Sequence, residues 1–163
     1  MVKAIIILPG TVLVFVPAVI LMITKDFALT QQLANPHQIS FWLALLAASP
    51  GFILSFWTVK LFLNLGEGTP APWDPPKKLV IHGPYCYVRN PMITGVLLIL
   101  LAEALLFQSW PIALWMVVFF IGNAIYFPLF EEKRLGRKFG EEYLKYKDNV
   151  PRWIPRLKAW KQE

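Results

Sequence analysis

Long apolar stretches separated by polar segments dominate the organisation of this 163-residue chain. Residues 4–24 contain no charged side chain, and residues 39–63, 92–108 and 110–130 are three further, predominantly apolar stretches. An α-helix rises about 1.5 Å per residue, so about twenty residues cross the hydrocarbon core of a bilayer, which is roughly 30 Å thick. We therefore predict an all-α, polytopic integral membrane protein with about four transmembrane helices, five being the alternative count.

Details of the stretches refine this prediction. A cleaved signal peptide is the alternative for residues 4–24, but the apolar run is long and no clear small-x-small site follows it before Lys25, which favours an uncleaved helix. Pro50 lies in the middle of the second stretch and predicts a kink, because proline removes a backbone donor. The third and fourth stretches almost adjoin and predict a tight antiparallel hairpin.

Two polar segments accompany the apolar stretches within the single predicted domain, residues 1–163. Residues 64–91 contain six prolines and predict an irregular, proline-rich loop. Residues 131–163 form a basic tail, in which 131–148 has the periodicity of an amphipathic helix, predicted to lie at the membrane surface. The apolar positions of that helix are Leu135, Phe139, Tyr143 and Tyr146.

Composition and charge agree with a membrane location and exclude other classes. The chain is 56% hydrophobic with a net charge of +6, and its mean hydropathy is +0.51. Its basic residues flank apolar segments, which indicates contact with membrane lipids and not with nucleic acid. One cysteine excludes an internal disulfide, and two distant histidines give no metal-ligand spacing. The positive-inside rule places both termini and the loop in the cytoplasm, and a prokaryotic cytoplasmic membrane is the expected location.

The stretch GPYCYVRNP predicts the N-terminus of a helix that offers an anion site. Pro91 fits the first helical position, and the residue before a proline avoids the helical region. Free backbone N–H groups and the adjacent Arg89 would attract a carboxylate. The alternative is that Asn90 only caps the helix while Arg89 extends to lipid phosphates.

The stretch FEEKR places two acids where the fourth apolar stretch ends. Glu131 and Glu132 face a basic environment there and predict a cation site. The alternative is pairing with Lys133, Arg134 or Arg89 in a solvated network. A ligand with a carboxylate, an ammonium and a sulfonium would satisfy both stretches, with the faces of Tyr85, Tyr87 or Tyr126 against the sulfonium. S-adenosylmethionine is such a ligand.

The patterns LVxxGPYxxVRNPMxxG and FEExxLxxxFGEEYxxYxxxVPRWIP, spanning residues 66–155, resemble the isoprenylcysteine carboxyl methyltransferase and phospholipid methyltransferase family. These are integral-membrane enzymes that convert S-adenosyl-L-methionine to S-adenosyl-L-homocysteine. The resemblance implies that Arg89 and Glu132 orient the site and have catalytic roles. It also implies cofactor contacts from both segments: Lys77, Lys78, Leu79, Val80, Tyr85, Asn90, Pro91, Met92, Ile93 and Glu131.

The chain departs from the prenylcysteine enzymes of that family at particular positions. It has Arg-Asn-Pro in place of Arg-His-Pro, Ile93 where an aromatic is frequent, and Phe127 where those enzymes have a substrate-binding arginine. Prenylcysteine, a phospholipid amine, a small thiol and another hydrophobic acid therefore stay open as acceptors. An amine would need a general base, for which His82 and Glu132 are candidates.

We therefore expect an S-adenosylmethionine-dependent methyltransferase whose lipophilic acceptor enters from the bilayer, without a metal. One alternative is a non-catalytic lipid-binding or assembly protein, and another is a membrane reductase similar to sterol reductases. Glu103, within the third apolar stretch, is expected to have a structural role and to face Asn123.

Overall fold

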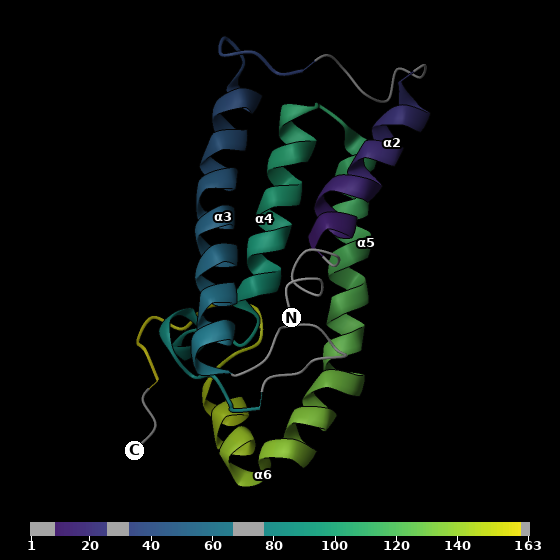
Figure 1. Ribbon diagram of the computed structural model, residues 1–163. Coiled ribbons are helices and arrows are strands. Elements are labelled where there is room, and N and C mark those ends of the chain that lie inside the picture. The colour runs from purple at the N-terminus through teal and green to yellow at the C-terminus, as the bar shows by residue number, and fades with distance from the viewer. Residues whose placement is uncertain (1–8, 26–32, 67–76, 161–163) are drawn as a thin grey trace.

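The computed structural model describes residues 9–25, 33–66 and 77–160, and its regular structure is helical, with no strand in those ranges. Apolar helices stand side by side, and a bent amphipathic helix lies below one end of them (Figure 1). The prediction of an all-helical fold is confirmed. In chain order the elements are η1 Thr11–Phe15, α2 Val16–Thr24, α3 Ile39–Leu65, η2 Gly83–Cys86, α4 Pro91–Leu106, α5 Trp110–Tyr126, η3 Phe127–Glu131 and α6 Glu132–Asn149.

The exposed surfaces of the apolar helices, and the lengths of two of them, suit a membrane protein. α3 and the continuous helix Trp110–Asn149 are each long and apolar enough to cross a bilayer, whereas Thr11–Thr24 and Pro91–Leu106 are shorter apolar helices. Large apolar side chains such as Ile39 and Phe56 are exposed on the outside of α3. This arrangement suits a lipid environment, in which apolar surface needs no protein cover. The number of helices that span the bilayer stays a prediction.

Small residues bring α3 and α4 into close contact. A Cβ atom at Gly51 would lie 2.9 Å from Ile99 Cγ1 and 3.0 Å from the Gly95 carbonyl oxygen. A Cβ atom at Gly95 would lie 2.6 Å from Ser55 Oγ. Glycine is therefore required on both sides of this contact, as in other membrane helix pairs built on small residues. α3 continues through Pro50 as one helix.

α4 and α5 form the tight hairpin that the sequence predicts. α4 begins at Pro91, in the first helical position as expected, and ends at Leu106. Gln108 turns the chain with a φ of 46°, and the Ser109 N–H donates to the Ala104 carbonyl at 2.9 Å. α5 begins immediately afterwards at Trp110, so the two helices are antiparallel neighbours.

The helix does not end where the apolar stretch ends. α5 passes through the π-helical segment η3 directly into α6, so Glu131 and Glu132 lie inside a continuous helix. Pro128 in η3 removes one backbone donor, and π segments of this kind recur at functional sites. α6 then bends at Gly140, whose φ is 56°. The bend turns the second half of α6 back beneath the bundle (Figure 1).

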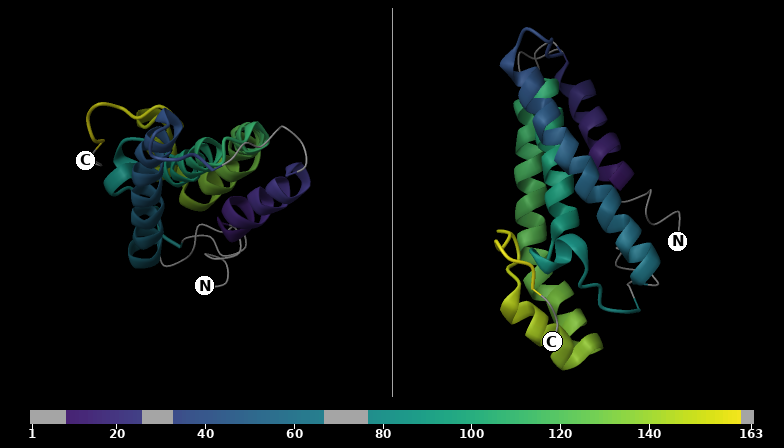
Figure 2. Two further views of the ribbon diagram at one scale, coloured as in Figure 1. Left: turned by 90° about the horizontal axis from the view of Figure 1, so that it is seen from above. Right: turned by 90° about the vertical axis from the view of Figure 1, so that its left-hand side faces the viewer.

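The apolar face of α6 is buried against the chain itself, and the location of this helix at the membrane surface stays a prediction. Tyr143, Tyr146 and Val150 are buried there. The tail after α6 then folds along residues 83–89 (Figure 2). The Arg89 N–H donates to the Pro151 carbonyl at 2.9 Å, and the Trp160 N–H donates to the Cys86 carbonyl at 2.9 Å. The residues that complete this cluster are Leu79, Ile81, Leu135, Phe139 and Trp160.

Candidate active site

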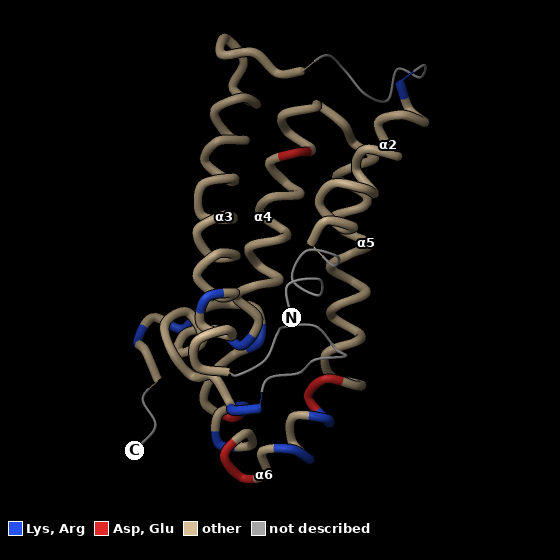
Figure 3. Tube along the Cα trace, in the orientation of Figure 1, with Lys and Arg blue, Asp and Glu red and all other residues tan. Residues whose placement is uncertain are grey.

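A cavity of about 290 Å³ lies where the lower ends of the apolar helices meet α6. Its walls come from segments far apart in the sequence: η1, α3, residues 79–96, α5, η3 and α6. Charged residues gather at this end of the molecule, whereas the helices above it carry few (Figure 3). The cavity therefore joins a polar region to an apolar one.

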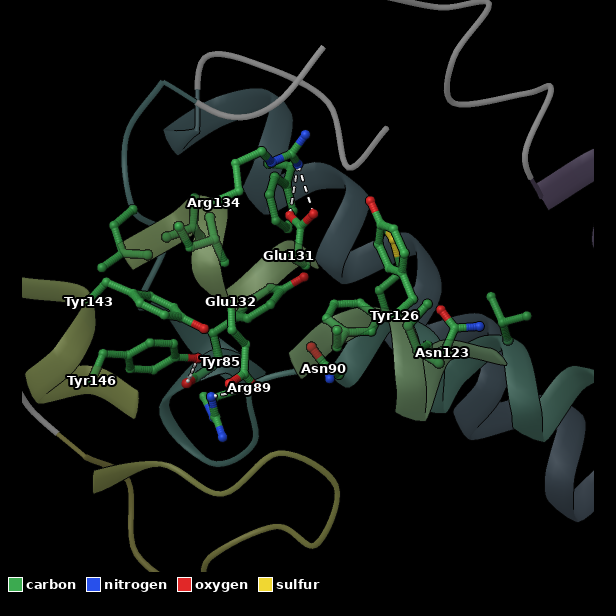
Figure 4. Close-up of a pocket in the computed structure, with 18 of the residues that line it drawn as sticks. Tyr85, Arg89, Asn90, Asn123, Tyr126, Glu131, Glu132, Arg134, Tyr143 and Tyr146 are labelled. Atoms are coloured by element: carbon green, nitrogen blue, oxygen red, sulfur yellow. Dashed lines mark hydrogen bonds and ion pairs between the residues drawn. The ribbon is translucent and has the colours of Figure 1, made fainter. Parts of the chain in front are cut away.

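Most of the predicted site residues line this cavity, including Asn90 and Glu131, which belong to the two separate sequence patterns (Figure 4). The others that line it are Leu79, Val80, Tyr85, Arg89, Met92, Ile93 and Glu132. Lys77 and Lys78 are exposed and lie outside the wall, with both backbone N–H groups directed to the Gly66 carbonyl at 2.7 and 3.3 Å. Pro91 is buried but does not line the cavity. The predicted loop residues 67–76 lie outside the described residues.

The Asn90 side chain does not cap α4. It makes no capping hydrogen bond, and its Nδ2 atom is buried in the cavity wall without a hydrogen-bond partner. Asn90 is only 8% exposed, so water does not easily satisfy this donor. An unsatisfied buried donor costs about 1–3 kcal/mol, which makes it a candidate contact for a ligand acceptor atom.

Glu132 is the centre of a buried ion-pair cluster. Its Oε1 atom accepts from Arg89 Nη1 at 3.0 Å and from Arg152 Nε at 2.6 Å, and its Oε2 atom lies 3.2 Å from Lys147 Nζ. Glu132 is 6% exposed and Arg89 is 11% exposed, so Arg89 does not extend to lipid phosphates. Burial alone would raise the pKa of Glu132, but Arg152, Arg89 and Lys147 outweigh it and lower that pKa. Glu132 is therefore ionised at neutral pH and engaged with protein cations.

Glu131 has a different and more accessible partner. Arg134 Nη2 donates to both of its carboxylate oxygens, at 2.8 and 2.9 Å. Arg134 is 36% exposed and Glu131 is 16% exposed, and both line the cavity. The predicted alternative of pairing therefore holds for both acids, with Arg134 and Arg89 among the partners, although the Glu132 cluster is buried and not solvated.

A group of tyrosines, two of them from the second half of α6, lines the cavity beside these ion pairs (Figure 4). Tyr146 Oη donates to the Tyr85 carbonyl at 2.8 Å. Burial and, to a smaller extent, the nearby Glu132 charge raise the pKa of Tyr143 to about 12. Burial also raises the pKa of Tyr85 and of Tyr146. These hydroxyls stay neutral over the physiological range.

The opposite wall of the cavity is apolar and comes from the membrane helices. The sequence analysis named Tyr126 as a candidate but did not identify most of the other residues of this wall, because both faces of such helices are apolar. Asn123 adds a polar group here, with its Nδ2 atom donating to the Phe119 carbonyl at 2.8 Å. Tyr126 and Phe127 continue this wall towards Glu131. The remaining residues of this wall include Pro9, Val12, Val59, Phe62 and Val96.

Other predicted candidates lie away from the cavity. His82 is exposed and Tyr87 is partly exposed, and neither lines the wall. Glu103 lies in the last turn of α4, at the far end of that helix from Asn90. Since Asn123 lines the cavity and Glu103 does not, the expected facing pair is not formed.

The described residues form a helical protein in which two helices are long and apolar enough to cross a membrane, with a cavity at one end of the apolar helices. A family model described as phospholipid methyltransferase matches residues 39–142, more than half of the chain, and the chain belongs to the phospholipid methyltransferase family. The match extends from α3 into α6 and includes both Asn90 and Glu131. No curated protein and no solved structure matches the chain. Family membership confirms the resemblance and indicates a membrane methyltransferase.

Proposed function

We propose that this protein is an S-adenosylmethionine-dependent methyltransferase that modifies a lipophilic acceptor arriving from the bilayer. The observation that carries the proposal is the shared cavity of Asn90 and Glu131, which lie in different sequence patterns. Family membership supports methyl transfer and a lipid substrate. The cofactor and the location of its site are inferred from the chemistry of the residues that line the cavity.

The side chains in the cavity fit the functional groups of this cofactor. Asn90 Nδ2 is a buried donor without a partner and suits a carboxylate. Glu131 offers two carboxylate oxygens for an ammonium group. The rings of Tyr126 and Tyr85 line the same cavity and suit a sulfonium, since cations are attracted to aromatic faces. Apolar contacts to the nucleoside are assigned to Leu79, Val80, Met92 and Ile93.

The apolar wall fits an acceptor with a hydrocarbon chain. Val59 of α3, Val96 of α4 and Phe119 of α5 line it, and each belongs to an apolar helix. Phe127 lies about one helical turn before Glu131 in η3, and both residues line the cavity. An acceptor that enters between the helices would therefore bring its polar end towards the acids while its chain stays in an apolar environment.

Alignment and exclusion of water are the main contributions that the protein makes in this proposal. The bound cofactor supplies an electrophilic methyl group. Holding two reacting groups in line contributes about 7–11 kcal/mol to a reaction of this kind. We assign Arg89 and Glu132 to positioning, because Glu132 already has three cationic partners and a lowered pKa, which make it a poor general base. His82, Lys77, Lys78 and Pro91 are left out because they lie outside the cavity wall.

Calorimetric titration of the detergent-solubilised protein with S-adenosylhomocysteine tests the cofactor. Glu131→Gln removes the charge with little change in volume and should weaken binding at least about tenfold, the equivalent of one charge-assisted hydrogen bond. Asn90→Asp replaces a donor by an acceptor and should weaken binding similarly. The matched control Glu141→Gln, on the exposed side of α6, should bind as the wild type does.

The same titration separates the alternative functions. Absence of binding by the wild-type protein would contradict the proposal and favour a non-catalytic membrane protein. Binding of a nicotinamide dinucleotide in place of S-adenosylhomocysteine would favour a reductase. Incubation of membranes with a labelled methyl donor tests the acceptor, since the proposal requires that the label enters the lipid extract only when the protein is present.

A further inference from the structure

The C-terminal segment, residues 150–160, packs its tryptophans inwards. The centroid of the Trp153 ring lies 5.2 Å from that of Phe120 and 6.1 Å from that of Phe127, and both phenylalanines belong to the long helix that includes α5. The Trp160 ring lies 5.9 Å from that of Tyr146. Packing against other aromatic rings of the chain therefore accounts for both tryptophans. They do not indicate which surface the outer side of the segment contacts.

Aliphatic side chains take the outward positions on this segment. Ile154 is 79% exposed and Leu157 is 101% exposed. Burying such a side chain is worth about 1.5–3 kcal/mol, and this gain is forgone at both positions if the segment lies in water. Arg156 lies between these two positions, and its N–H donates to the Tyr87 carbonyl at 3.0 Å, which attaches this part of the segment to the chain with Ile154 and Leu157 facing outwards.

The charges on the segment are all of one sign. Arg152, Arg156 and Lys158 are basic, and residues 150–160 contain no acid. Arg152 is engaged with Glu132, whereas Lys158 is exposed and Arg156 donates to the Asn149 carbonyl at 2.8 Å. An anionic phospholipid interface has negatively charged head groups above an apolar acyl region. Exposed aliphatic side chains beside cations complement such an interface.

The position of the segment fits that surface. Because Trp153 contacts Phe120 of α5, the segment lies alongside a helix whose own outward side chains are apolar. It also lies beside the charged end of the molecule, where the helices leave their apolar region (Figure 3). We propose that residues 150–160 dock on anionic phospholipids, with Ile154 and Leu157 inserted below the head groups and Arg156 and Lys158 among the phosphates. This proposal does not depend on the cofactor.

Spin labels on the full chain in lipid nanodiscs test the docking. Cys86→Ser removes the single cysteine, and Ile154→Cys, Leu157→Cys and the control Glu141→Cys then each carry one nitroxide. In discs containing phosphatidylglycerol, labels at 154 and 157 should be accessible to oxygen and protected from a water-soluble nickel complex. The label at 141 should be accessible to the nickel complex. Circular dichroism verifies that each variant is folded.

The charge of the lipid provides the second part of the test. Arg156→Gln combined with Lys158→Gln should reduce the docked-to-undocked ratio of the Leu157→Cys label about thirtyfold in anionic discs, the equivalent of about 2 kcal/mol at about 1 kcal/mol per cation. Nickel accessibility at 154 and 157 equal to that at 141 would overturn the proposal. Protection from both reagents would also overturn it, since that pattern indicates a protein contact. Equal insertion in discs of phosphatidylcholine alone would overturn the role of lipid charge.

Discussion

Replacement of Glu132 by glutamine should destabilise the folded protein because it leaves buried cations without their anion. Glu132→Gln keeps the size of the side chain but removes the charge that Arg89, Arg152 and Lys147 share. Arg89 is largely buried, so it cannot recover its solvation easily. Arg152 and Lys147 are more exposed, and their contributions are reduced by solvent screening. We therefore expect the free energy of unfolding to fall by about 3 kcal/mol, the lower end of the range for breaking a buried ion pair.

The effect should depend on pH with a definite sign. The folded-state pKa of Glu132 is lowered, so its contribution is present above the unfolded pKa and is lost as the pH falls through the folded pKa. The difference in free energy of unfolding between the wild type and Glu132→Gln should therefore be full at pH 7 and shrink on acidification below the usual carboxyl range. Denaturant titration in detergent micelles at several pH values measures this difference.

A surface acid on the same helix provides the control for this experiment. Glu141→Gln lies on the exposed side of α6 and should change the free energy of unfolding by less than about 0.5 kcal/mol. Equal stability of Glu132→Gln and the wild type at pH 7 would refute the reasoning, as would a difference that grows on acidification. A stable Glu132→Gln protein that had lost only activity would instead identify Glu132 as a catalytic base.

Further predictions concern packing and the tyrosine wall. Gly95→Ala places a Cβ atom 3.0 Å from the Gly51 carbonyl oxygen and should cost about 1–3 kcal/mol in the free energy of unfolding, whereas Gly122→Ala, with open space around it, should not destabilise the protein. Tyr146→Phe leaves the Tyr85 carbonyl without its donor and should cost about 1–3 kcal/mol, again measured by denaturant titration.

The helices and their starting points could be predicted from the sequence. Apolar runs of sufficient length mark α3, α4 and α5, and prolines at the first positions fix where α4 and α5 begin. The continuity of the long helices was harder to predict, because a proline within an apolar helix can be accommodated, and the kink at Pro50 stays a prediction. α3 continues through Pro50, and the helix after α5 continues through Pro128 by adopting a π segment.

The candidate site could be predicted where the two sequence patterns that carry the family resemblance contribute to it. The resemblance identified Asn90 and Glu131 as members of one site, and the structure places both in one cavity. Arg89 was among the predicted partners of the two acids, but Arg152 and Lys147 were not, since they reach Glu132 only after α6 bends at Gly140. Residues contributed by α3 were also missed, because a uniformly apolar helix has no periodicity that indicates which face lines a cavity.

The two acids at the cavity differ in how easily a ligand can reach them, and this difference supports separate roles. Both are already paired, so a cationic group of a ligand must either join a protein cation at the carboxylate or replace it. Glu132 is held by several cations, among them the buried Arg89, and replacement there would disrupt the contacts that attach the C-terminal tail. Glu131 is paired with Arg134, which is 36% exposed and therefore closer to solvent than Arg89. Replacing the protein cation at Glu131 therefore costs less free energy than replacing one at Glu132. For this reason we assign the ligand ammonium to Glu131 and the positioning of Arg89 to Glu132.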